Sequence, residues 1–178
     1  MKKNLLALAS SLIILCVLTI RYLSDFETFR AGQSLLLPVW VEEVKTDLFS
    51  SKVRIRYYNF IPVENLIKET GTVVVNRFDD GQVDFVAKSV NQRLHPRELL
   101  LKYTLVPPSF LGNKNQSLNI RFASSELRFF NEETEQLSAI RYAVVHVNDI
   151  GEALLVGLAD NMGTQLIKGI AFSDFHTP

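Results

Sequence analysis

The sequence predicts a mainly β domain, an antiparallel sandwich or barrel with two short helices, preceded by one N-terminal transmembrane helix. Three observations support this prediction. An uncharged, mostly apolar run fills residues 5–20, apolar and polar residues alternate repeatedly from residue 34 onward, and turn-forming sequences separate the alternating stretches. Alternation with a period of two is typical of strands that bury one face, and antiparallel sheets are its usual setting.

The composition divides the chain into three parts. We predict a membrane anchor at residues 1–23, a stalk at 24–33 and a β-rich domain at 34–178. The last part has an ordinary size for one domain and is rich in phenylalanine and branched aliphatic residues, so it can bury a core without disulfides or metals.

The apolar run is predicted to anchor the chain in a membrane. Sixteen helical residues span about 24 Å, a little less than a bilayer core of about 30 Å, so flanking side chains would complete the contact of residues 4–22 with the bilayer. Lys2 and Lys3 precede the run and favour a cytoplasmic N-terminus. The chain would then cross the inner (cytoplasmic) membrane once, with its C-terminal domain in the periplasm or outside the cell.

Two other interpretations of the run stay open. A cleaved signal peptide would need small residues before its cleavage site, and residues 18–23 read Leu-Thr-Ile-Arg-Tyr-Leu. A helix buried in the domain core would normally show a polar face, and only Ser10, Ser11 and Thr19 interrupt the run. We therefore favour an anchor that is not cleaved. The single cysteine, Cys16, lies within it.

About eight or nine strands follow from the alternation and from the turns between the alternating stretches. They are predicted at 35–41, 53–58, 72–78, 82–90, 99–105, 118–122, 142–147, 152–158 and 164–172. Asp79-Asp80-Gly81 and the segment 148–151 are typical of tight hairpin turns, and 160–163 leads into the last strand.

Two short helices are expected between the strands. The first covers residues 62–70, with Pro62 in its first turn and Gly71 after its end. The second begins at Asn131, predicted to act as its cap, and carries glutamates in its first turn and Arg141 at its end. That charge order suits the dipole of a helix.

Composition and motifs argue against several functional classes. After residue 21 the chain carries 16 basic and 19 acidic side chains, a balance that disfavours nucleic acid binding. The three histidines are isolated in sequence, and no catalytic motif occurs, so we expect no metal and no cofactor, and the sequence leans against enzyme activity without deciding it. A serine–lysine hydrolase stays open as an alternative. It would use Ser50 or Ser51 with Lys52, Lys88 or Lys102, although the last two lysines fall on predicted solvent-facing sides.

One strand presents a polar stripe that is the candidate binding site. Arg54, Arg56 and Tyr58 alternate with the apolar residues of the strand and therefore share its other face. The stripe is either an ordinary solvated face or a docking surface for an anionic or protein partner.

The chain resembles the GDYXXLXY family in several segments. Residues 47–57 are similar to the family's D-L-F-R-G-D-Y-x-x-L-x-Y run, with Ile55 and Tyr57 matching L-x-Y and Ser-Ser-Lys standing in place of Gly-Asp-Tyr. Residues 127–133, 139–147 and 151–160 are similar to its F-F-x-x-E-G, A-R-Y-G-x-x-R-V and G-x-A-L-L-V-G-L-x-D segments. The resemblance implies a membrane-anchored, β-rich extracytoplasmic domain with no assigned reaction. Family members are often encoded beside a polytopic membrane protein, which implies an accessory role.

These observations together predict a membrane-tethered extracytoplasmic binding or accessory module. It would dock a membrane-protein partner, such as a polytopic membrane protein, or an envelope ligand. The alternatives are the membrane-anchored hydrolase and a pilin-like assembly subunit, which also joins an apolar N-terminal helix to a β domain. Pilin-type processing, however, requires a glycine before the apolar run, where this chain has Asn4.

Overall fold

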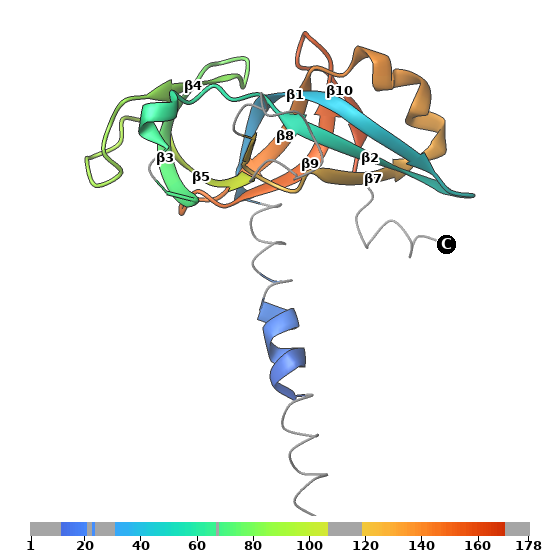
Figure 1. Cartoon of the computed structure of the whole chain (residues 1–178), viewed down its shortest axis with the longest axis horizontal. Helices are drawn as coiled ribbons and strands as arrows, with labels where there is room; N and C mark the ends of the chain where they lie inside the picture. Colours follow the sequence, from blue (N-terminus) through green and yellow to red (C-terminus); the bar gives the residue numbers. More distant parts are fainter. Residues whose placement is uncertain (1–11, 21–22, 24–30, 67, 107–118, 170–178) are drawn as a thin grey trace, which may run out of the picture.

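The computed structural model describes residues 12–20, 23, 31–66, 68–106 and 119–169. Within these residues, ten strands form two curled antiparallel sheets, and two short helices interrupt the strands (Figure 1). The predicted mainly β fold with two short helices is confirmed. The strands number one or two more than the alternation indicated.

The first sheet has six strands and combines the beginning of the domain with its end. In spatial order these strands are β10 (Gln165–Lys168), β9 (Ala153–Ala159), β8 (Tyr142–Val147), β1 (Gln33–Thr46), β2 (Ser50–Tyr57) and β7 (Glu126–Phe130). Strand β1 is long enough to pair with β8 through its first half and with β2 through its second half. It therefore holds the first and last parts of the domain together.

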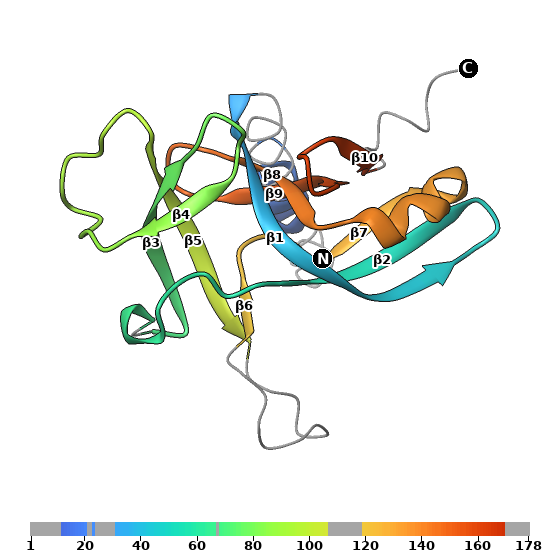
Figure 2. The same cartoon turned by 90° about the horizontal axis from the view of Figure 1, so that it is seen from above.

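The second sheet has four strands and comes from the middle of the domain. Its spatial order is β4 (Val83–Val86), β3 (Thr70–Arg77), β5 (Glu98–Val106) and β6 (Asn119–Arg121). Figure 2 shows β3, β4 and β5 on one side of β1, with β2 and β7 extending on the other. The chain thus completes the second sheet before it returns to the first.

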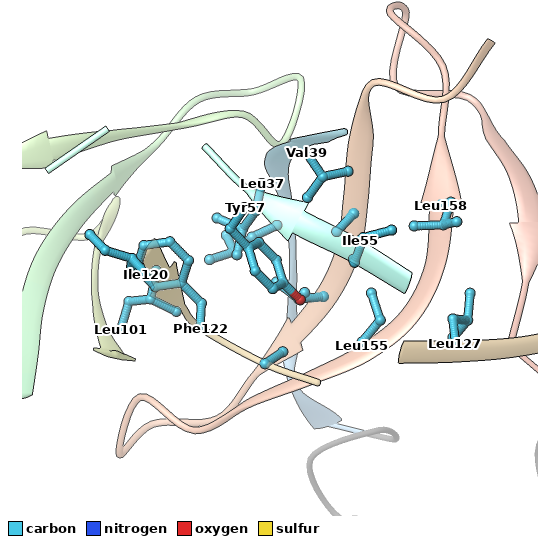
Figure 3. Packing of buried hydrophobic residues seen from close by; sticks show 14 of the residues in the cluster. Leu37, Val39, Ile55, Tyr57, Leu101, Ile120, Phe122, Leu127, Leu155 and Leu158 are labelled. Carbon is cyan, nitrogen blue, oxygen red and sulfur yellow. The ribbon is translucent and has the colours of Figure 1, made fainter. Parts of the chain in front are cut away.

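One hydrophobic core joins the two sheets. Figure 3 shows the buried cluster extending from Leu101 and Ile120 of the second sheet to Leu127 and Leu158 of the first. Tyr57 is buried in this cluster, with its ring edge-on to Phe122, which follows β6, at 5.7 Å between ring centroids. Because burial of apolar area is the main favourable term in folding, this shared core fixes the two sheets against each other.

The differences from the predicted strands have local causes. Strand β1 continues to Thr46, well past the predicted end, because a register shift between Val41 and Glu43 interrupts the alternation without ending the strand. Strand β7 was not predicted, although Leu127 and Phe129 are buried and their neighbours Arg128 and Phe130 are exposed. Parts of two predicted strands, residue 118 and residues 170–172, lie outside the described residues.

Both predicted helices are 3₁₀ helices, η1 (Val63–Asn65) and η2 (Asn131–Ala139). The first is much shorter than predicted, and Thr70, its expected last residue, already begins β3. The cap prediction for Asn131 is wrong, because the cap position of η2 is Phe130 and no side chain caps it. Arg141 does donate to the Ser138 carbonyl near the end of η2, at 3.1 Å, as its position indicated.

The described part of the N-terminal segment is a helix that does not enter the core. Residues 12–20 are helical, and their large apolar side chains are 59–68% exposed. Figure 1 shows this helix apart from both sheets. The alternative of a buried core helix is therefore wrong for these residues. In the part of the chain that the structure describes, no helix has the length and apolar content to cross a bilayer. Of the predicted stalk, residues 24–30 lie outside the description, and Gln33 already belongs to β1.

An ion pair joins the two ends of the connection between β4 and β5. It predicts that the stability of the domain depends on pH. Lys88 Nζ lies 2.5 Å from Glu98 Oε2, and both side chains are largely buried. The hydrogen bond from Lys88, and then that from the backbone N–H of His95, hold the pKa of Glu98 below its usual value of 4.5. Because the folded state binds this proton more weakly, the stabilisation is present above pH 4.5 and is lost as the pH falls through the lowered pKa.

We expect Glu98→Gln to flatten the acid side of the stability profile. The wild type should lose stability more steeply than the variant as the pH falls below 4.5, and the two profiles should run parallel above pH 6. Urea unfolding of the full chain in detergent micelles, followed by circular dichroism at several pH values, measures this difference. Glu64→Gln, an exposed change in η1, is the control. Identical acid slopes for wild type and Glu98→Gln would contradict the assignment.

Candidate functional site

The predicted stripe lies together on one face, as the alternation indicated. Within β2, Val53, Ile55 and Tyr57 are buried, whereas Arg54 and Arg56 face outward, and Tyr58 continues the stripe just after the strand. The structure therefore brings the three predicted site residues to the same side of the first sheet. The sequence did not indicate that acidic side chains of the neighbouring strands pair with these arginines.

Arg54 is held by carboxylates from both neighbouring strands. Its guanidinium donates to Glu126 of β7 at 3.0 Å and lies 3.0 Å from Glu43 of β1. Lys52 also contacts Glu126, with Nζ 2.5 Å from Oε2. The hydrogen bonds that Lys52 and then Arg54 donate to Glu126 lower the pKa of this carboxyl. The hydrogen bond that Arg54 donates to Glu126, and then the negative charge of Glu43, raise the pKa of Arg54. This end of the stripe is therefore an exposed ion-pair network.

Arg56 and Tyr58 are positioned by Trp40 of β1. Arg56 forms an ion pair with Glu42, and its guanidinium carbon lies 5.4 Å from the centre of the Trp40 ring. The rings of Trp40 and Tyr58 meet edge to face, with centroids 4.4 Å apart. The aromatic contacts hold the guanidinium over an apolar surface, which limits its conformations before any ligand arrives.

A groove of about 340 Å³ lies beside the stripe, where β2 of the first sheet meets β6 of the second. Its charged lining consists of Arg54, Arg56, Arg121 and Glu42. Its apolar lining includes the buried residues Ile55, Tyr57 and Ile120. The lining of the groove therefore carries three guanidinium groups and one carboxylate.

Arg121 is the groove residue that the sequence analysis missed. It is exposed at the end of β6, and among the described residues no acidic side chain pairs with it. Arg54 and Arg56, in contrast, each have a carboxylate partner. The alternation of residues 118–122 placed Arg121 on a solvent-facing side, but nothing in that local pattern indicated that β6 lies next to β2.

The buried tyrosine under the groove has a structural role. Tyr57 donates its hydroxyl hydrogen to the Ser124 carbonyl at 2.8 Å, and burial raises the pKa of the phenol well above its usual range. A phenol with a raised pKa and a satisfied hydrogen bond is neither a base nor a free donor near neutral pH. It therefore contributes shape and stability to the floor of the groove.

Ser51, one of the two serines in the alternative hydrolase hypothesis, is not arranged as a nucleophile. Ser51 is buried, and its hydroxyl lies 2.8 Å from Asn131 Oδ1 and 3.1 Å from Thr46 Oγ1. Of the candidate lysines, Lys102 is exposed and paired with Glu152, as its predicted solvent-facing position allows. Lys88 was also predicted to face solvent, but it is largely buried and paired with Glu98. A nucleophilic serine needs a neighbouring base, and Ser51 has amide and hydroxyl neighbours in its place.

Other candidate sites in the described residues lack converging chemistry. No group of three or more histidine, cysteine, aspartate or glutamate residues there could hold a metal ion. A second pocket, about 410 Å³, lies on the second sheet and is lined by Phe85, Val90 and Lys88, among others. Lys88 is already paired, so this pocket offers no free charge to a ligand.

Comparisons of this chain with protein families, with curated proteins and with solved structures found no match. The resemblance to the GDYXXLXY family therefore stays a prediction from the quoted segments. The functional argument depends on the chemistry of the groove and of the N-terminal segment.

Proposed function

We propose that this chain is a membrane-tethered binding module whose β domain lies outside the cytoplasm. It docks an acidic segment of a membrane-protein partner, or an anionic envelope ligand, in the groove between β2 and β6. The observation that carries the proposal is the presence of Arg54, Arg56 and Arg121 around one groove, with Arg121 unpaired in the described part of the chain. Guanidinium groups bind carboxylates and phosphates through paired hydrogen bonds, so the groove suits an anionic group.

The tether is supported by the N-terminal segment. Residues 12–20 form a helix with exposed apolar side chains, and the same uncharged run extends from 5 to 20 behind two lysines. An exposed apolar helix is unfavourable in water and favourable in lipid, and leading lysines favour a cytoplasmic N-terminus. A single crossing of the inner membrane would thus leave the groove on the extracytoplasmic side, where a membrane-protein partner can reach it.

The residues that line the groove favour binding over catalysis. In the described residues its lining contains guanidinium groups, an apolar floor and one carboxylate, and no histidine, cysteine or lysine. The carboxylate, Glu42, is held in an ion pair with Arg56. General acid–base chemistry would need a group that titrates near neutral pH, and arginine does not. An arginine-rich groove can hold and orient an anion without reacting with it.

Arg121→Glu is expected to abolish docking in the groove. Replacing a charge-assisted partner by a repelling charge removes about 1.5–3 kcal/mol or more, which lowers affinity by at least tenfold. A photo-crosslinking amino acid at Asn119, which lines the groove, should give a discrete adduct in native membranes that Arg121→Glu eliminates. Arg93→Glu, an equal charge change at an exposed loop position, should leave the adduct intact.

The same experiment can contradict the proposal. The crosslinker placed at Met162, an exposed turn residue, reports background labelling. If the Asn119 probe labels no more than the Met162 probe, or if its adduct persists in Arg121→Glu, the groove is not the docking site. Both charge variants should unfold like the wild type, because substitutions at exposed positions usually change stability by less than about 0.5 kcal/mol.

A further inference from the structure

The β1–β2 hairpin ends in two exposed apolar side chains that the groove does not use. Leu48 is 89% exposed and Phe49 is 84% exposed at the apex of this hairpin, residues 47–50. Figures 1 and 2 both show the hairpin reaching outward, on the far side of β1 from the second sheet. Adjacent large apolar residues that are almost fully exposed suggest an interaction site.

Turn chemistry does not account for Leu48 and Phe49. Tight hairpins favour asparagine, aspartate or glycine at their central positions, because these residues tolerate positive φ or form local hydrogen bonds. Other turns of this domain follow that rule, with Gly81 at φ +87° and Gly151 at φ +83°. The β1–β2 apex instead presents a leucine and a phenylalanine, so its composition needs a reason other than turn formation.

The apex is held in one conformation by hydrogen bonds that converge on it. The backbone N–H of Asp47 donates to the Ser50 carbonyl at 2.9 Å. The side-chain amide of Asn131 donates to the Asp47 carbonyl at 2.9 Å and accepts a hydrogen bond from Ser51 at 2.8 Å. Thr134 lies within 3.4 Å of the same Ser51 hydroxyl. This partly buried polar cluster therefore fixes the apex to η2, and little conformational entropy would be lost when the apex binds.

A row of cations lies directly behind the apex. Lys45 of β1 faces Lys52 of β2, and Lys52 faces Arg128 of β7, so the three lie side by side across the outer face of the sheet. Lys45 and Lys52 form ion pairs with Glu43 and Glu126, which stand in the next row away from the apex, so both lysines keep their exposed positions nearer the apex than their partners. In the described part of the chain no acidic side chain pairs with Arg128. Asp47 is the one acidic residue in the apex itself. An apolar tip backed by cations matches the profile of an anionic lipid surface, which is apolar below and negatively charged at its face.

We infer that the apex of the β1–β2 hairpin inserts Leu48 and Phe49 into the interfacial region of an anionic lipid leaflet. The inference rests on the proposed tether, which keeps the domain next to the membrane and raises the effective concentration of lipid around it. A protein partner is a poorer fit, because a specific interface buries about 800 Å² per partner and two side chains on a convex tip supply far less. Lipid needs no complementary shape. Insertion would orient the domain and fix the direction in which the groove faces.

A single-tryptophan experiment on the full chain tests the insertion. Trp40, the only tryptophan, is replaced by phenylalanine, and Phe49→Trp supplies the probe. The protein is reconstituted in vesicles of phosphatidylcholine and phosphatidylglycerol that contain brominated lipid. We expect blue-shifted emission and loss of most of the intensity by bromine quenching. The matched control places the probe at Met162, which is 84% exposed on another turn, and should show emission typical of water with little quenching.

The same assay also tests whether the cation row contributes to insertion. Lys45→Gln with Lys52→Gln, or vesicles of phosphatidylcholine alone, should reduce the quenching at position 49 several-fold, and added salt should have a similar effect. Equal quenching in neutral and anionic vesicles would overturn the role of the cations. Quenching at position 49 no stronger than at position 162 would overturn the insertion. Shielding that appears only in native membranes, and not in protein-free lipid, would assign the apex to a protein partner and also overturn it.

Failure of this inference can be told apart from failure of the tether. After alkaline carbonate washing, the same vesicles are sedimented and the bound protein is measured. Protein that sediments with the vesicles but shows a water-exposed probe at position 49 overturns the insertion alone. Protein released by the wash overturns the proposed tether, and the insertion with it.

Discussion

Replacing Phe129 by alanine is expected to lower the free energy of unfolding of the β domain by about 3–5 kcal/mol. Phe129 is fully buried and is the largest of the completely buried side chains among the residues that the structure describes. It comes from β7, an edge strand of the first sheet, and belongs to the core shared with the second sheet. Truncation removes the transfer free energy of the ring and leaves a cavity that the curled sheets cannot close. Domains are stable by only about 5–15 kcal/mol, so the variant should be near its folding limit.

The neighbouring Phe130 provides a matched control for this prediction. It lies on the same strand but faces outward and is 44% exposed. Phe130→Ala removes the same ring and should change stability by less than about 0.5–1 kcal/mol. Urea unfolding of both variants, in the full chain and under the same detergent, measures the difference. Equal losses for the two variants would show that the inward and outward faces of β7 are assigned incorrectly.

This pair of residues also shows what the sequence could and could not indicate about the fold. The alternation of Leu127 and Phe129 with Arg128 and Phe130 was present, but an exposed phenylalanine weakens the contrast on which alternation depends. The second half of β1 was missed for a related reason. A bulge places Glu42 and Glu43 together and shifts the pattern by one residue. The alternation thus predicted most strands in which apolar and polar residues alternate without interruption. It failed where the fold accepts an exposed apolar residue or a bulge.

The local sequence did not show that η2 is a 3₁₀ helix or where it begins. Asn131 followed by glutamates is typical of a helix start, yet the Asn131 side chain is used to hold the β1–β2 apex and Ser51. An amide engaged 84 residues away along the chain cannot also cap its own helix. The Asn131 side chain binds Asp47 of the β1–β2 hairpin and not its own helix. This hairpin lies next to η2 because β2 and β7 are neighbours in the sheet, which the local sequence does not show.

The candidate site divides in the same way. The alternation in β2 correctly placed Arg54, Arg56 and Tyr58 on one face. It could not supply the acids opposite them, because Glu43 and Glu126 lie on strands that flank β2 only through the sheet order. Arg121 was missed because the approach of β6 to β2 is a contact between the two sheets. The sequence was enough to predict which arginines of β2 face outward. Whether an acidic side chain pairs with each arginine depends on which strands lie next to each other, and the local sequence does not show this.

Replacing Ile13 and Ile14 together by arginine is expected to release the chain from the membrane. Both residues lie in the middle of the apolar run and are more than 60% exposed on a helix that the sheets do not cover. Each arginine near the centre of a bilayer-inserted helix costs about 2.5–3.5 kcal/mol, so the pair should shift partitioning toward water on the order of a thousandfold or more. The measurement is the fraction of protein that sediments with membranes after alkaline carbonate extraction.

The control for this release keeps the run apolar. Ile13→Leu with Ile14→Leu preserves hydrophobicity and should remain fully membrane-bound, while circular dichroism should show the same β domain in both double variants. Membrane retention of the arginine variant would contradict the tether, because no other described segment offers an exposed apolar helix. The intact mass of the mature wild-type protein tests the signal-peptide alternative, since cleavage would leave a chain that begins after the run. A mature chain that still contains residues 12–20 would keep the groove and the β1–β2 apex at the membrane surface, where the proposed docking has to occur.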